Sequence, residues 1–127
     1  MTNEFELEPS PKAKKTNRLE ADSLTEVIQA LRTHDAVAWV RRQNTGAAKV
    51  GGRFIKFGWA GCTDLLGMMK DGRLLAVECK RPNGGKISVE QAHFISMVNK
   101  FGGCAFVATS ATDVFNNLGV DHASDGY

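Results

Sequence analysis

Residues 61–80 read GCTDLLGMMKDGRLLAVECK, which is two apolar runs on either side of an Asp-Gly pair. This pattern predicts a β-hairpin with strands over 64–69 and 73–81. The first strand begins with Asp64, and the second ends with Glu78 and Lys80. A hairpin of this kind brings an aspartate, a glutamate and a lysine to one end of a sheet.

The register of the hairpin determines whether the two carboxylates meet. Cross-strand partners point to the same face of a sheet, with Cβ atoms about 4.5–5.5 Å apart. A two-residue Asp71-Gly72 turn would place Asp64 opposite Cys79 and turn Glu78 to the other face. A three-residue loop over 70–72, with the glycine in the left-handed region, places Asp64 opposite Glu78. A site that uses both carboxylates therefore requires the three-residue loop.

Asp64, Glu78 and Lys80 suit metal-assisted hydrolysis of a phosphodiester. Two neighbouring carboxylates, helped by the backbone carbonyl of Cys79, can bind Mg²⁺ or Mn²⁺. The metal lowers the pKa of a bound water and neutralises charge that grows on the phosphate. Lys80 can orient that water or stabilise the developing charge. The alternative is a structural ion pair between strands, because charged residues are ordinary on exposed strand faces.

The flanking sequence predicts an α/β fold, a mixed β-sheet flanked by helices in the order α-β-β-β-α-β-α. Ser88 is the expected N-cap of the second helix, and Gly102-Gly103 ends it. A glycine-rich loop is expected after the first strand. The expected helices cover 19–34, 88–101 and 112–118, and the expected strands cover 36–40, 64–69, 73–81 and 104–110, with a short strand or strand edge at 53–57.

One domain is expected over 19–118, between a flexible N-terminal tail (1–18) and a C-terminal tail (119–127). The chain has 127 residues and 43% hydrophobic content, which is enough for one core. No apolar run approaches the ~20 residues that span a bilayer, and no signal peptide is evident, so a cytoplasmic protein without membrane contact is expected. The three cysteines form no close pair, which indicates free thiols in a reducing compartment. The net charge of +2 does not by itself indicate nucleic-acid binding.

Gln91 lies on the apolar face of the second helix, with Phe94 and Ile95. A buried, unbonded amide costs roughly 1–3 kcal/mol, so Gln91 needs a polar partner. We expect it in the first turn, aimed at the sheet end that carries the carboxylates, where it would hold Lys80 or the water. A solvated helix start is the alternative.

Glu20 stands in the same relation to the apolar positions of the first helix, such as Leu24. If that helix begins by Leu19, Glu20 is also a first-turn residue, and it would bind metal through water or close a second site. A solvated helix start is again the alternative. Glu26 is a rival, although Ser23-x-x-Glu26 is also a capping box, which explains Glu26 without chemistry.

Basic and polar residues lie on both sides of the predicted site in the sequence. If they cluster on one side of the fold, they would contact phosphates and make binding strongly salt-dependent. A solvated sheet edge is the alternative. These candidate DNA-binding residues are Arg41, Arg42, Asn44, Arg53, Lys56, Arg81 and Lys86.

Taken together, these motifs resemble the PD-(D/E)XK nuclease superfamily, and more closely the virus-type replication–repair nuclease (VRR-Nuc) domain. The resemblance covers about 19–118 and rests on Gly-x-x-Asp, Glu-x-Lys, a helix that opens Ser-x-x-Gln, and Gly-Gly before a strand. The segments at 42–46 and 51–54 resemble phage members. Thr63 stands where the family often has proline, which leaves the entry of the strand less rigid.

The resemblance implies a restriction-endonuclease-like core and a Mg²⁺/Mn²⁺-dependent DNA endonuclease of bacterial or phage DNA repair. Stand-alone members are associated with homodimers that act on branched DNA such as four-way (Holliday) junctions. By position, metal ligation carries over to Asp64, Glu78 and the Cys79 carbonyl, and the glutamate of the first helix maps to Glu20. Catalytic support carries over to Lys80 and Gln91. A non-catalytic nucleic-acid-binding module on the same fold is the alternative function.

Overall fold

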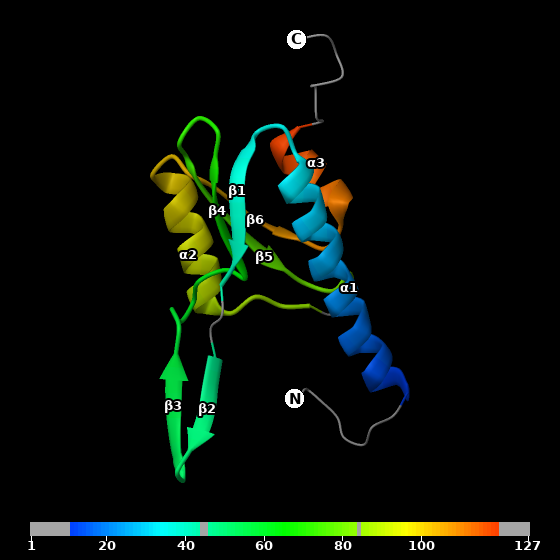
Figure 1. The fold of residues 1–127 in the computed structure, drawn as a ribbon, viewed down its shortest axis with the longest axis vertical. Helices are drawn as coiled ribbons and strands as arrows, with labels where there is room; N and C mark the ends of the chain where they lie inside the picture. Colours follow the sequence, from blue (N-terminus) through cyan, green and yellow to red (C-terminus); the bar gives the residue numbers. More distant parts are fainter. Residues whose placement is uncertain (1–10, 44–45, 84, 120–127) are drawn as a thin grey trace.

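The computed structural model describes residues 11–43, 46–83 and 85–119. Four strands form the main sheet in the order β1-β4-β5-β6, while β2 and β3 form a separate two-stranded hairpin (Figure 1). In the main sheet β5 and β6 are parallel and the other pairs are antiparallel. The elements are α1 (Pro11–Thr33), β1 (Val37–Arg42), β2 (Gly46–Val50), β3 (Arg53–Phe57), β4 (Leu65–Met69), β5 (Leu74–Cys79), α2 (Val89–Lys100), β6 (Cys104–Ala108) and α3 (Ala111–Leu118). The predicted class, a mixed sheet flanked by helices, is confirmed.

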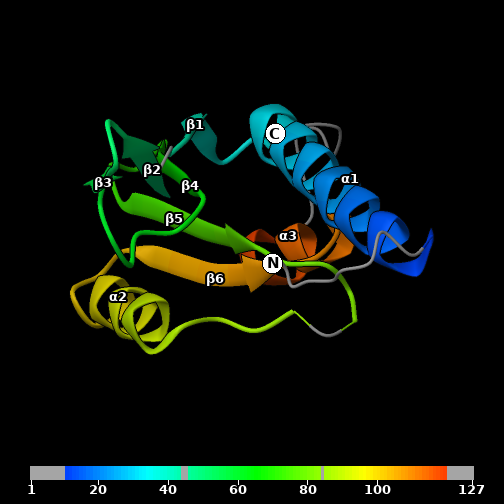
Figure 2. The same cartoon turned by 90° about the horizontal axis from the view of Figure 1, so that it is seen from below.

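Helices cover both faces of the main sheet (Figure 2). On one face, α1 and α3 contribute Val27, Leu31 and Val114 to a core that includes Leu75 and Val77 of β5. On the other face, α2 packs on Ala76 and Ala105 through Phe94 and Val98. Successive residues of a strand point to opposite faces. Residue 78 of β5 therefore lies on the same face as residue 76, beneath α2.

The turn between β4 and β5 is the three-residue loop that the two-carboxylate site requires. Met69 N donates to Arg73 O at 2.8 Å, and Gly72 N donates to Met69 O at 2.9 Å. Gly72 has φ +94, which a glycine adopts without steric cost. The loop therefore comprises residues 70–72, as predicted.

The start of the first helix differs from the prediction. α1 begins at Pro11 and not at Leu19. Proline is tolerated in the first helical turn, and the alanine and lysines that follow it are good helix formers, so the helix continues through a segment without an apolar face. Ser23 consequently lies inside the helix, and the predicted capping box with Glu26 is wrong. Glu26 Oε2 instead accepts a hydrogen bond from Ala111 N at 2.7 Å and satisfies the first turn of α3.

The glycine-rich segment is not a loop. β2 pairs with β3 in antiparallel register: Gly46 lies opposite Phe57 at one end and Val50 opposite Arg53 at the other, and Gly51-Gly52 forms the turn. Both glycines have positive φ, +58 and +79, which is the geometry of a two-residue turn that matches the twist of a β-hairpin. The short strand or strand edge predicted at 53–57 is confirmed as β3, whereas β2 and its pairing with β3 were not predicted, and the order α-β-β-β-α-β-α omits both strands. It matches the order of the remaining elements, which are the main sheet and its helices.

None of the helices in the described part of the chain is long and apolar enough to cross a membrane. Cys62 and Cys79 are buried, Cys104 is half-buried, and all are free thiols. Burial raises the pKa of the Cys62 and Cys104 thiols.

Gly67 allows β1 and β4 to approach closely. The register between these strands shifts between Val37 and Trp39, and a Cβ at position 67 would overlap the carbonyl oxygen of Trp39. We expect Gly67→Ala to lower the free energy of unfolding by about 2 kcal/mol or more, because the obstacle is backbone. Chemical denaturation measures this, with Lys70→Ala as control, since Lys70 is exposed just after the same strand. An unchanged stability for Gly67→Ala would contradict the observed β1–β4 register.

Candidate active site

The β4–β5 register brings the two carboxylates together at one end of the main sheet. Leu65 pairs with Val77, so the next positions toward the open end, Asp64 and Glu78, face each other. Asp64 N donates to Glu78 Oε1 at 3.0 Å, and Cys79 N donates to Asp64 Oδ2 at 3.0 Å. The predicted juxtaposition is confirmed, and hydrogen bonds hold both carboxylates in place.

Glu78 is almost fully buried, with 1% of its surface exposed. Its Oε2 accepts from Gln91 Nε2 at 2.9 Å and lies 3.1 Å from the ammonium of Lys80. With the bond from Asp64 N, three donors surround this carboxylate. A carboxylate has about four acceptor sites. One therefore remains for a further partner.

Gln91 links the start of α2 to the carboxylates. Its side chain accepts from Ser88 N and its backbone N donates to Ser88 Oγ, both at 3.0 Å, which is a capping box. The other end of the same amide donates to Glu78. The predicted position in the first turn and the need for a polar partner are confirmed. The partner is Glu78 itself, whereas Lys80 or the water was expected.

Burial raises the pKa of Glu78, and the charge of Asp64 raises it further. Lys80 and the hydrogen bond from Asp64 N act in the opposite direction with smaller effect. The ionised pair therefore stores repulsion around a carboxylate that is almost fully buried. A cation between the two carboxylates would relieve that repulsion.

The raised pKa of Glu78 makes its stability contribution depend on pH. A carboxylate with a raised folded pKa contributes stability below its ordinary value of 4.5, and this contribution is lost as pH rises through the folded pKa. Glu78→Gln cannot ionise. We therefore consider the free energy of unfolding of Glu78→Gln minus that of the natural protein, measured by urea denaturation in metal-free buffer. This difference should increase from mildly acidic to neutral pH, because only the natural protein loses the contribution of protonated Glu78. A difference that does not change with pH would contradict the raised pKa.

The donor groups of the site fit a hard divalent cation. The Cys79 side chain is buried in the core beneath α1, on the other face of the sheet, so its thiol cannot bind a metal at the site. The candidate metal ligands are therefore oxygen atoms: the carboxylates of Asp64 and Glu78 and the Cys79 carbonyl. The second oxygen of Asp64 has no hydrogen-bond partner among the described residues. No group of three or more His, Cys, Asp or Glu side chains that could hold a metal occurs in the described part of the chain. Two carboxylates and a carbonyl would leave Mg²⁺ with several waters, which it usually keeps.

Two residues that the sequence did not single out as structural supports fix the entry to β4. Thr63 is buried and donates from Oγ1 to Leu65 O at 2.8 Å, so a hydrogen bond tethers the segment that was expected to be less rigid. Gln43 N donates to Asp64 O at 2.6 Å. The tendency of threonine to bond nearby backbone is a signal that could have indicated the first contact. The second joins distant segments and leaves no local signal.

Glu20 is not a first-turn residue, because α1 begins at Pro11. Its backbone lies within α1, the helix that packs on the sheet face opposite α2. Its side chain lies outside the described part of the structure, so metal binding by Glu20 stays a prediction.

The candidate DNA-binding residues do not gather on one face. Arg41 pairs with Leu66, two residues from Asp64 along the chain, and so lies with Asp64 on the α2 face. Arg42 pairs with Leu65 and points to the other face. Arg81 donates from Nε to Asn83 O at 2.7 Å just after the site, and Lys86 is exposed in the following segment. Arg53 lies at the tip of the β2–β3 hairpin and Lys56 further along β3, with its side chain undescribed. Asn44 lies outside the described residues.

No protein-family model, no curated protein and no solved structure matches this chain.

Proposed function

We propose that this chain is a Mg²⁺- or Mn²⁺-dependent endodeoxyribonuclease that hydrolyses phosphodiester bonds in branched DNA. The observation that carries the proposal is the convergence of Asp64, Glu78, Lys80 and Gln91 at one end of the sheet, through the register and contacts given above. These groups come from three places in the fold: Asp64 directly precedes β4, Glu78 and Lys80 lie at the end of β5 and just after it, and Gln91 lies in the first turn of α2. A structural ion pair alone requires neither the second carboxylate nor the amide.

The topology supports a restriction-endonuclease-like core of the VRR-Nuc kind. Apart from the β2–β3 hairpin, the elements run α-β-β-β-α-β-α, with three antiparallel strands followed by a helix and a parallel strand. The two carboxylates lie at the end of the antiparallel pair, and the glutamine lies in the first turn of the helix that follows.

Asp64 and Glu78, with the backbone carbonyl of Cys79, would hold the metal ion. When bound, the ion would supply positive charge to the scissile phosphate and acidify the attacking water. Gln91 fixes the orientation of the Glu78 carboxylate through its 2.9 Å hydrogen bond. The Lys80 side chain is 19% exposed, so its ammonium reaches the site from the solvent side. There it can stabilise the negative charge that develops on phosphate oxygens, or orient the water.

Arg41 supports contact with DNA phosphates near the site, because it is exposed on the same face as Asp64. A second copy of the chain is part of the proposal, since symmetric cutting of a four-way junction needs two sites and each chain supplies one. The expected partners are therefore DNA and a second copy of this chain.

Incubation of the purified chain with an end-labelled four-way junction tests the proposal. We expect discrete cleavage products with Mg²⁺ or Mn²⁺ and none with EDTA. A linear duplex and a flap of the same sequence show whether branching is required. Metal-independent binding without cleavage of any of these substrates would refute the nuclease and favour a nucleic-acid-binding module on this fold.

A further inference from the structure

The β2–β3 hairpin stands apart from the rest of the molecule (Figure 1). Its strands pair with each other and, among the described residues, neither has substantial packing against another element. An isolated two-stranded hairpin is marginally stable in water. Its exposed apolar side chains, Val50 at 56% and Phe54 at 78%, gain nothing from the core. The hairpin therefore adds little to the stability of the core, and its exposed side chains are available to bind a partner.

Charge identifies the kind of partner. The segment 43–60 contains Lys49, Arg53 and Lys56 and no aspartate or glutamate. Neither Lys49 nor Arg53 forms an ion pair with another described residue. Cationic side chains without carboxylate partners, together with exposed apolar groups, match the phosphates and bases of a nucleic acid.

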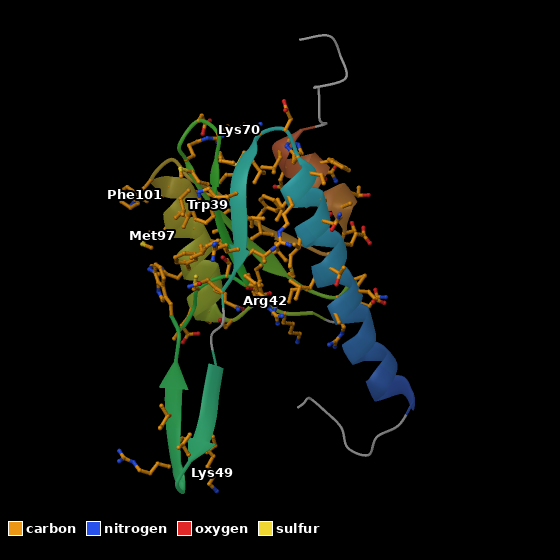
Figure 3. All side chains as sticks on the ribbon, in the orientation of Figure 1. Trp39, Arg42, Lys49, Lys70, Met97 and Phe101 are labelled. Carbon is orange, nitrogen blue, oxygen red and sulfur yellow. The ribbon has the colours of Figure 1, made fainter. Side chains whose placement is uncertain are left out.

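The turn at the opposite end of the sheet offers a contrast. There Lys70 lies 3.8 Å from Asp35, and Arg73 lies 2.9 Å from Asp71, so both cations are paired with carboxylates. Figure 3 shows Lys49 and Lys70 at opposite ends of the molecule. The tip of β2–β3 thus differs from the β4–β5 turn in that its cations have no carboxylate partner among the described residues.

The register divides the tip into two faces. Lys49 pairs with Phe54, so a cation and an aromatic ring lie on one face, while Arg53 pairs with Val50 on the other. One face can contact a phosphate and a base together, and Arg53 can reach the opposite strand of the same groove. A two-stranded ribbon fits the major groove of B-DNA.

The base of the hairpin is attached at the candidate active site. Gln43, which precedes the hairpin, donates from its backbone N to Asp64 O at 2.6 Å, and the chain returns through residues 58–63 to Asp64. Five residues per strand extend roughly 17 Å at 3.4 Å per residue. At ~3.4 Å per base pair, the strands alone match the length of about five base pairs.

We propose that the β2–β3 hairpin is a DNA-binding arm that holds the duplex flanking the scissile phosphate. Lys49 and Arg53 contact backbone phosphates in the groove, and Phe54 stacks on bases that are unstacked at a branch point. This inference rests on the proposed nuclease function. It adds the element that selects the substrate.

The test measures binding of a labelled four-way junction to Asp64→Asn protein in EDTA by fluorescence anisotropy, so that cleavage plays no part. In that background Lys49→Ala/Arg53→Ala should raise Kd roughly tenfold or more at about 0.1 M salt. It should also reduce the slope of log Kd against log salt by about 1.8, for two lost phosphate contacts. Lys70→Ala/Arg73→Ala removes the same residue types from the other turn and should change Kd by less than about threefold. Phe54→Ala should weaken junction binding more than binding to a linear duplex.

Thermal unfolding by circular dichroism checks that the tip variants fold, as expected for a hairpin outside the core. Equal effects of the two double variants would overturn the arm. So would unchanged DNA affinity with a change of oligomeric state by light scattering, which would place the hairpin at an interface between copies. Tip-dependent binding without metal-dependent cleavage by the natural protein would support the arm and refute the nuclease. Cleavage with tip-independent binding would support the nuclease and overturn the arm.

Discussion

Replacement of Asp64 by alanine is expected to reduce metal-dependent cleavage of a four-way junction by about a hundredfold or more. Asp64 supplies one of the two carboxylates that face each other across β4 and β5, and its second oxygen is available for a metal ion. A bound metal contributes several kcal/mol to stabilisation of the transition state, and each 1.36 kcal/mol is about tenfold in rate. Initial rates in saturating Mg²⁺ or Mn²⁺ measure the loss.

The matched control for this variant is Asp71→Ala, at the other end of the same hairpin. Asp71 is exposed and pairs with Arg73 at the turn, far from Glu78. We expect Asp71→Ala to cleave at a rate close to that of the natural protein. Asp64→Ala also loses the hydrogen bond to Cys79 N, which costs about 1 kcal/mol of stability and leaves the fold intact. An Asp64→Ala protein that retains most of its cleavage rate would contradict the proposed site.

Replacement of Glu78 by alanine is expected to abolish calorimetric Mn²⁺ binding and to lower the free energy of unfolding by about 2 kcal/mol. The carboxylate accepts from Asp64 N, Gln91 Nε2 and Lys80 Nζ, and its removal leaves these donors without their acceptor in a nearly closed site. An unsatisfied buried donor costs about 1–3 kcal/mol. The loss of repulsion with Asp64 and the partial exposure of Lys80 reduce the total.

This pair of measurements separates the two interpretations of Glu78. If Glu78 and Lys80 form only a structural ion pair, Glu78→Ala lowers stability and Mn²⁺ binding is the same before and after the change. If Glu78 is a metal ligand, binding is lost. Lys80→Met serves as control, because it removes the ion pair and leaves both carboxylates in place. Its Mn²⁺ affinity should be retained or increased, since a competing cation has been removed.

The geometry of the carboxylate pair could be predicted from the sequence because it depends on local rules. Gly72, the third residue of the loop, fixes the register, and the register fixes which residue faces Asp64. The start of α2 follows in the same way from the Ser88–Gln91 capping box. The start of α1 could not be predicted from apolar spacing, because its first turns form without an apolar face.

The remaining features depend on contacts between distant segments. Glu26 was expected to cap its own helix, whereas it caps α3, 85 residues away. The strand β2 was interpreted as a loop, because its glycine and alanines carry little strand signal and its pairing depends on a two-glycine turn. Arg41 and Arg42 are adjacent in sequence and were grouped together, yet the alternation of a strand sends them to opposite faces.

A crystal structure of the protein soaked in Mn²⁺, with anomalous diffraction collected near the manganese edge, tests most directly whether Asp64 and Glu78 share one ion. We expect an anomalous peak within about 2.0–2.3 Å of a carboxylate oxygen from each residue and of the Cys79 carbonyl. Gln91 is expected to remain hydrogen-bonded to Glu78. The absence of a peak between the two carboxylates at saturating Mn²⁺, with Glu78 still paired to Lys80, would contradict the proposed metal site.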